Sequence, residues 1–154
     1  MKDGDCAGLA AFNSDTGALV IKKRGKRLFL QMVELSCQLS DRDKEVTKVD
    51  EKVVDEILLT PHLSSLTSKI FLRIDADFRP GSGQRRFMGG ADCANFYYSL
   101  DGEQWTRIGT ENYRLSFDWR RFFMGTKFGL FCYATKKAGG YVDIDEFCYE
   151  KAAK

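Results

Sequence analysis

The stretch FFMGTKFGLFCYATKKAGGYVDIDEFCYE, residues 122–150, decides the fold class of this chain. It predicts two strands, Lys127 to Ala134 and Tyr141 to Tyr149, joined by the turn-forming TKKAGG. Tyr, Phe, Val, Ile and Leu dominate both runs, and these residues suit a pleated, half-buried surface. Asp143 and Asp145 lie on one face of the second strand, because side chains alternate along a strand. Two carboxylates on one face indicate a catalytic pair, a metal site or a solvated face.

The bulk composition is that of an ordinary globular protein. At 154 residues the chain is long enough for one domain with a single core. A net charge of +2 gives no reason to expect nucleic acid or an anionic membrane as a partner. The single histidine, His62, effectively excludes histidine-based triads and histidine-cluster metal sites. No apolar run approaches membrane length, and the opening MKDGD does not read as a signal peptide.

The cysteines are odd in number and show neither CxxC spacing nor the density of a disulfide scaffold. We expect free, buried thiols, because Cys behaves as a small apolar residue inside a sheet. Free thiols favour a reducing, cytoplasmic compartment. The five cysteines are Cys6, Cys37, Cys93, Cys132 and Cys148.

Short strands separated by turn-forming residues recur along the rest of the chain. Asp101-Gly102 marks a hairpin turn between two aromatic-rich arms. Regular short strands with almost no convincing helix predict an all-β fold, an antiparallel two-sheet jelly-roll sandwich. The other expected strands cover residues 6–12, 18–23, 27–34 and 68–78.

Residues 43–60, DKEVTKVDEKVVDEILLT, carry an ambiguous pattern. Their apolar residues recur at helical spacing, which alone predicts a helix. The segment is also rich in valine and lies between predicted strands, and tertiary context often overrides such a pattern. We therefore expect a loop followed by a strand that ends near Leu59.

The two aspartates of the last predicted strand do not form a glycosidase pair. Retaining glycosidases on jelly-roll sandwiches carry E-x-D-x-E or E-x-D-x-x-E on one strand, which sets two acids on the same face. Here Tyr141 occupies the position of the first acid of the motif, and Glu146 lies on the opposite face of the strand. We therefore expect no catalytic residue in this chain.

Two other residues have competing interpretations. Asp145 is a candidate ligand of a structural calcium ion, because sandwiches of this shape often hold one with an Asp near the start of the last strand and backbone carbonyls. The alternative is an Asp that bonds loop amides. Trp105 is either a sugar-stacking platform or a ring that packs over the edge of its own sheet.

Four stretches together resemble one known family. They look like the C-terminal β-sandwich module of family 43 glycoside hydrolases, the β-xylosidases, α-arabinofuranosidases and related xylan-degrading enzymes. The resemblance runs from about Asp5 to Glu150. The stretches are AGLAAFNSDTGALVIKK, SKIFLRIDADF, NFYYSLDGEQWTRIG and FMGTKFGLFCYATKKAGGYVDIDEFCYE.

The resemblance implies a concanavalin A-like sandwich, residues 1–154, that packs against a catalytic propeller. That propeller and the first strands of the module are absent from this sequence. The chain is then a non-catalytic module that supports the catalytic domain of a xylan-active hydrolase. In some family members a loop of the module lends an aromatic side chain to the catalytic pocket, and Phe123 or Phe122 stands at the matching position. Both could instead pack in the core or at the domain interface.

The alternative function is a free-standing carbohydrate-binding sandwich. It would stack xylo-oligosaccharides on Trp119, Tyr113 and the neighbouring Phe residues. An open aromatic cleft on the concave sheet would favour this alternative. An apolar patch too large for a soluble monomer would favour the ancillary module.

Overall fold

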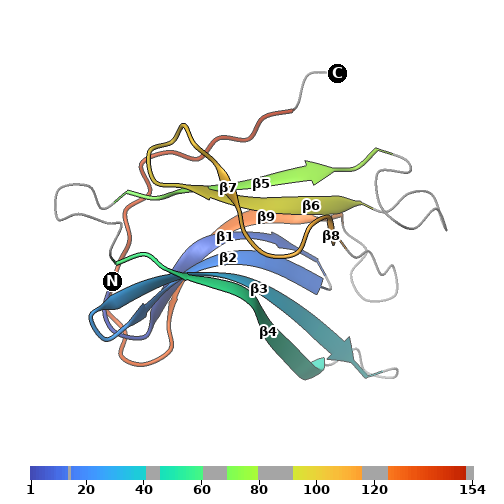
Figure 1. Cartoon of the computed structure of the whole chain (residues 1–154). Helices are drawn as coiled ribbons and strands as arrows, with labels where there is room; N and C mark the ends of the chain where they lie inside the picture. Colours follow the sequence, from blue (N-terminus) through green and yellow to red (C-terminus); the bar gives the residue numbers. More distant parts are fainter. Residues whose placement is uncertain (14, 41–45, 61–68, 80–91, 116–124, 152–154) are drawn as a thin grey trace.

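The computed structural model describes residues 1–13, 15–40, 46–60, 69–79, 92–115 and 125–151. These residues form two antiparallel sheets that pack face to face, and none of them is helical (Figure 1). The predicted all-β sandwich is confirmed. No helix in the described ranges is long and apolar enough to cross a membrane.

The larger sheet has five strands in the order β4-β3-β2-β1-β9 and forms the lower layer in Figure 1. Consecutive hairpins build its first four strands, and β9 returns from the far end of the chain to pair with β1. Gly25 forms the tip of the β2–β3 hairpin at a φ of 58°, a conformation that glycine adopts without steric cost. The strands are β1 Asp5–Phe12, β2 Asp15–Arg24, β3 Arg27–Leu39, β4 Val46–Leu58 and β9 Lys127–Ala134.

The smaller sheet forms the upper layer, with β5 and β7 on the two sides of β6 (Figure 1). The Asp101-Gly102 turn is confirmed, since Gly102 has a φ of 83° and Asp101 accepts backbone hydrogen bonds from Glu103 and Gln104. The second arm of that hairpin is paired over only two residues. The strands are β5 Phe71–Asp77, β6 Cys93–Ser99, β7 Thr106–Arg107 and β8 Tyr113–Arg114, which pairs with β6.

The main core lies between the sheets, where alternate residues of both layers meet. Leu19, Leu30 and Met32 from the larger sheet pack with Phe96 and Ile108 from the smaller one. Ile70, directly before β5, and Leu72, Ile74 and Ala76 of β5 also pack against this core.

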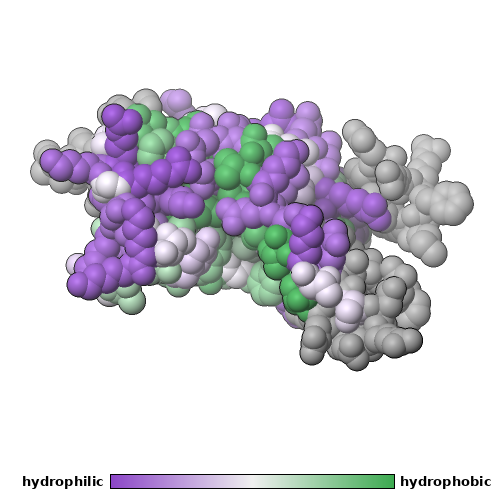
Figure 2. All heavy atoms as spheres, turned by 90° about the horizontal axis from the view of Figure 1, so that it is seen from below, coloured by the Kyte–Doolittle hydropathy of each residue, from purple (hydrophilic) through white to green (hydrophobic). Residues whose placement is uncertain are grey.

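A second apolar cluster lies on the opposite face of the larger sheet. It is made of small and β-branched residues, with Leu35 and Phe131 packed against it. Figure 2 shows this face, where hydrophobic surface alternates with hydrophilic side chains. The buried members are Cys6, Ala10, Ala18, Val20 and Val33.

The ambiguous segment is a strand and not a helix. β4 covers Val46–Leu58 and pairs along its length with β3, so the expected strand ending near Leu59 is confirmed. Residues 41–45, the expected loop, lie outside the described residues. Backbone pairing with β3 satisfies the hydrogen bonds that a helix would have formed internally, and the Val-rich composition suits it.

None of the five cysteines, all of which lie within the described residues, forms a disulfide, as predicted, but the expected burial holds only in part. Cys6 and Cys93 are buried, whereas Cys132 and Cys148 are exposed. The thiols therefore behave partly as core residues and partly as surface residues.

Candidate functional site: the open side of the sandwich

The chain does not form the predicted hairpin after β9. Thr135 donates a backbone hydrogen bond to the carbonyl of Gly4 at 2.9 Å, and the Met1 ammonium donates to the carbonyl of Tyr141 at 3.2 Å. Gly140 lies against Asp5 so closely that a Cβ would meet its carboxylate. The turn residues are thus held by the first five residues of the chain.

The predicted strand Tyr141 to Tyr149 is therefore wrong, because residues 141–150 form no strand. The segment leaves the larger sheet and crosses towards β5, as the red trace in Figure 1 shows. An ion pair between Lys69 and Asp145 holds it near the start of β5. Its apolar side chains stay exposed, with Tyr141 at 73% and Phe147 at 50%.

An open aromatic cleft lies at the edge of the sandwich and not on the face of a sheet, where this segment passes the beginning of the edge strand β9 and the end of the edge strand β5. Its volume is about 330 Å³. Phe128 lies at its centre, with ring centroids 6.4 Å from Phe78 and 6.1 Å from Tyr149. Four aromatic side chains and two polar ones line it: Phe78, Phe128, Phe147, Tyr149, Thr126 and Lys127.

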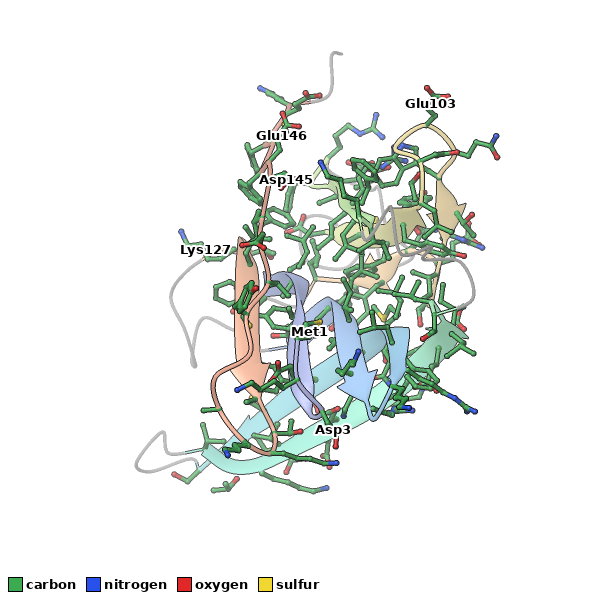
Figure 3. All side chains as sticks on the ribbon, turned by 90° about the vertical axis from the view of Figure 1, so that its left-hand side faces the viewer. Met1, Asp3, Glu103, Lys127, Asp145 and Glu146 are labelled. Atoms are coloured by element: carbon green, nitrogen blue, oxygen red, sulfur yellow. The ribbon has the colours of Figure 1, made fainter. Side chains whose placement is uncertain are left out.

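We use the term open side for the unpaired edge of β9, the C-terminal end of β5 and residues 141–150. In Figure 3 this part of the molecule lies along the left, with Lys127 at the start of β9 and Asp145 and Glu146 beyond it on the C-terminal segment. The side chain of Leu130, near the middle of β9, is 44% exposed. Apolar surface thus continues from the cleft along β9.

A charged pair at the end of β5 borders the cleft. The guanidinium of Arg79 donates to both carboxylate oxygens of Asp77, and its backbone amide also donates to Asp77. These hydrogen bonds lower the pKa of Asp77 to about 2. Asp77 is therefore ionised at neutral pH, directly before the aromatic ring of Phe78.

Three predicted site residues, Trp119, Phe122 and Phe123, lie outside the described residues. Thr126, which follows Phe122 and Phe123 in the sequence by four and three positions, lines the aromatic cleft.

Tyr113, the fourth predicted residue, belongs to the core. Only 9% of it is exposed, and its ring meets Phe96 edge-on with centroids 5.8 Å apart. Burial, with the nearby charges of Asp15 and Glu34, raises the pKa of Tyr113 above its ordinary value. Such a ring offers little surface for stacking on a sugar.

The surroundings of Asp145 do not fit a calcium site. Calcium takes six to eight oxygen ligands, whereas this exposed carboxylate pairs with the Lys69 ammonium. No group of three or more His, Cys, Asp or Glu side chains that could hold a metal occurs in the part of the chain that the structure describes. The calcium ion stays a prediction, without support from the donor set at Asp145.

Trp105 packs on its own sheet. The Arg73 guanidinium lies 4.4 Å from the Trp105 ring and 4.7 Å from the Tyr97 ring, and it pairs with Asp75 at 3.1 Å. Such stacking of a cation on two rings ties the hairpin after β6 to β5. This arrangement fits the second of the two interpretations of Trp105.

Sequence reasoning missed the cleft itself. Phe78, Phe128 and Tyr149 are far apart in the sequence and belong to no motif. One signal was present, since Phe147 and Tyr149 share the face of Tyr141 in a run that carries too many aromatic residues for an exposed strand. The sequence does not show that residues 135–140 lead the chain away from β9 towards β5. Without that path, these aromatic residues cannot be placed in one cleft.

The fold and the open side define a concanavalin A-like sandwich module. A family model described as the beta-xylosidase C-terminal concanavalin A-like domain matches residues 1–150, and the chain belongs to this family. The predicted resemblance is therefore confirmed. A search of curated proteins found no match.

Two solved structures are similar to the chain. One is a family 43 glycoside hydrolase engineered to display both endo-xylanase and exo-arabinofuranosidase activity, with 28% identity and a TM-score of 0.71. The other is a bifunctional family 43 protein with a CE part from Bacteroides eggerthii, with 28% identity and a TM-score of 0.62. Both alignments cover 91% of this chain, but only 25% and 14% of the other chains. The chain thus spans a quarter or less of the structures that it matches.

Proposed function

We propose that this chain is a non-catalytic ancillary module of a xylan-active family 43 glycoside hydrolase, and that the catalytic domain of that enzyme packs on the open side. The exposed aromatic residues of the open side carry the proposal. Contiguous exposed apolar surface on a soluble domain marks interaction sites. Aromatic residues are also the type most enriched at the centres of protein interfaces.

The carboxylates of the C-terminal segment support a non-catalytic role. Glycoside hydrolysis requires two carboxyl groups at a defined separation across the scissile bond. Asp143 and Asp145 are exposed on an irregular segment, and Asp145 is paired with Lys69.

The turn before Gly125 gives the module a second role. In the sequence, Phe122 and Phe123 lie four and three positions before Thr126, which lines the cleft. With the catalytic domain packed on the open side, this turn would lie at the boundary of the two domains. Phe123, or Phe122, would then reach the rim of the catalytic pocket and contact the bound saccharide.

Binding between this chain and the catalytic domain of the parent hydrolase tests the proposal. The two proteins are mixed, and the affinity is measured by calorimetry and co-elution. Replacing Phe147 and Tyr149 together by Ser should weaken binding at least tenfold, because both rings belong to the proposed interface. The control replaces Val46 and Val49 of β4 by Ser, two residues that are similarly exposed but distant from the cleft.

Equal binding by the two double variants would show that the open side is not the interface. Titration of the chain alone with xylo-oligosaccharides separates the alternative function. Measurable heats that disappear in the Phe147 and Tyr149 variant would indicate a carbohydrate-binding module instead.

A further inference from the structure

One end of the sandwich brings together the first residues of the chain, the tip of the β2–β3 hairpin and the loop after β9 (Figure 1). Asp3 connects the three segments. Its carboxylate accepts a hydrogen bond from the Gly25 amide at 2.7 Å and pairs with the Lys136 ammonium at 2.6 Å. The Gly4 amide also donates to the Lys23 carbonyl at 2.9 Å. These contacts fix three segments that are far apart in the sequence beside one another.

Lysine and arginine side chains meet at this end from all three segments, and we call it the basic end. Figure 3 faces it, with Met1 and Asp3 labelled. A Cβ at Gly139 would lie 3.0 Å from the Lys2 ammonium, so the Lys2 side chain reaches the loop after β9. The cationic residues of the basic end are all exposed or half-buried: Lys2, Lys22, Lys23, Arg24, Lys26, Arg27, Lys136 and Lys137.

The carboxylates at the basic end already have partners. Asp3 is shared by Lys136 and the Gly25 amide, Glu56 pairs with Arg24 at 2.8 Å, and Asp5 is buried. The cations without a carboxylate partner in the part of the chain that the structure describes are Lys2, Lys22, Lys23, Lys26, Arg27 and Lys137. The basic end therefore has an excess of positive charge, although the formal net charge of the whole chain is only +2.

We propose that the basic end binds the carboxylates of an acidic polysaccharide, namely a xylan that carries uronic-acid side groups. The proposal rests on the proposed function, which places the module beside xylan. A lysine ammonium is a compact charge on a flexible stem. Several lysines can therefore follow carboxylates that are irregularly spaced along a polymer. The local positive field would also raise the concentration of the acidic polymer near the enzyme.

The distribution of charge favours sparse carboxylates over the phosphates of a nucleic acid. Double-stranded DNA carries one negative charge for about every 1.7 Å of its axis, and domains that bind nucleic acid are usually strongly basic. The excess at the basic end exceeds the net charge of the chain, so the other residues together carry a negative net charge. They would repel a closely charged polymer that extends beyond the basic end.

Titration of the chain with two xylans tests the proposal. One is a glucuronate-substituted xylan, and the other is a neutral arabinoxylan of similar length. The affinity for the acidic xylan should be at least fivefold higher at about 50 mM salt. This preference should largely disappear at about 300 mM salt, because salt screens exposed charges.

A matched pair of double variants locates the binding surface. Lys26→Gln with Arg27→Gln removes two exposed charges from the basic end and should weaken binding of the acidic xylan at least fivefold. Lys48→Gln with Lys52→Gln removes the same charge from exposed positions of β4, towards its other end, and should change the affinity less than twofold. Far-ultraviolet circular dichroism checks that both variants are folded. Both should still bind the catalytic domain, because neither pair belongs to the open side.

Equal affinity for the two xylans would overturn the proposal and leave the proposed function in place. Equal weakening in the two double variants would also overturn it, because the attraction would then not belong to the basic end. Tighter binding of a DNA oligonucleotide than of the acidic xylan would assign the basic end to nucleic acid instead. Binding of the acidic xylan as expected, without any binding of the catalytic domain, would contradict the proposed function alone.

Discussion

Gly17 of β2 lies directly beneath the ring of Phe96 of β6, and this contact sets how closely the two sheets approach. A Cβ added at Gly17 would lie 2.5 Å from Cζ of Phe96 and 2.9 Å from the ring of Tyr113. Phe96 is fully buried and meets Tyr113 edge-on. The two rings therefore occupy the space that a side chain at position 17 would fill.

Gly17→Ala should destabilise the fold by about 1–3 kcal/mol, the usual cost of overpacking a core. Neither ring can move away easily, because both belong to the main core. Urea denaturation measures the change. Gly125→Ala is the control, since a Cβ there would meet no atom within 4 Å. Equal stability of both variants would show that the sheets can separate to admit a methyl group.

Asp77→Asn should remove part of the acid sensitivity of the fold. Because the folded pKa of Asp77 is about 2, below its ordinary value of 3.8, its contribution to stability is present above pH 3.8 and is lost as the pH falls towards 2. The melting temperature of the wild type should therefore fall more steeply between pH 4 and pH 2 than that of the variant. Arg79→Gln should flatten the same interval, because it removes the donor that lowers the pKa. Parallel curves for all three proteins would contradict the assignment.

Calcium should not change the melting temperature of this chain. A structural ion bound only to the folded state raises stability with its concentration, but Lys69 already neutralises Asp145. Scanning calorimetry with millimolar calcium and with a chelator makes the comparison. A rise of several degrees with calcium would show that other oxygens complete a site, and Asp145→Asn would then abolish the rise.

Phe123→Ala should impair the parent hydrolase if the turn before Gly125 contacts the saccharide. We expect a tenfold or greater loss of kcat/KM on xylo-oligosaccharides, with unchanged binding between the module and the catalytic domain. Phe122→Ala is the matched variant, and one of the two substitutions should leave kcat/KM nearly unchanged. Loss of domain binding in both would instead assign the two rings to the interface.

The sequence predicts well what short-range pairing determines. Strands β1, β2 and β3 follow each other through tight turns, so their alternation and turn residues are sufficient to locate them. β5 and the turn at Asp101 follow in the same way. β4 needed the context of its neighbours, because its spacing alone indicates a helix.

The sequence does not predict contacts between the two ends of the chain. Residues 141–149 have a strand composition, but the turn before them is held by Gly4, Asp5 and Met1, which are more than 130 residues away. The local sequence pattern contains no information about these contacts between the chain ends. The aromatic cleft depends on them, so the cleft could not be predicted either.

The contact between Met1 and Tyr141 fixes the direction in which any preceding polypeptide must leave the module. The Met1 ammonium nitrogen lies 3.2 Å from the Tyr141 carbonyl oxygen, and Asp5 is buried against Gly140. A domain joined to Met1 would thus emerge at the start of the C-terminal segment and not at the far end of the sandwich. A purification tag joined to Met1 would emerge at the same place.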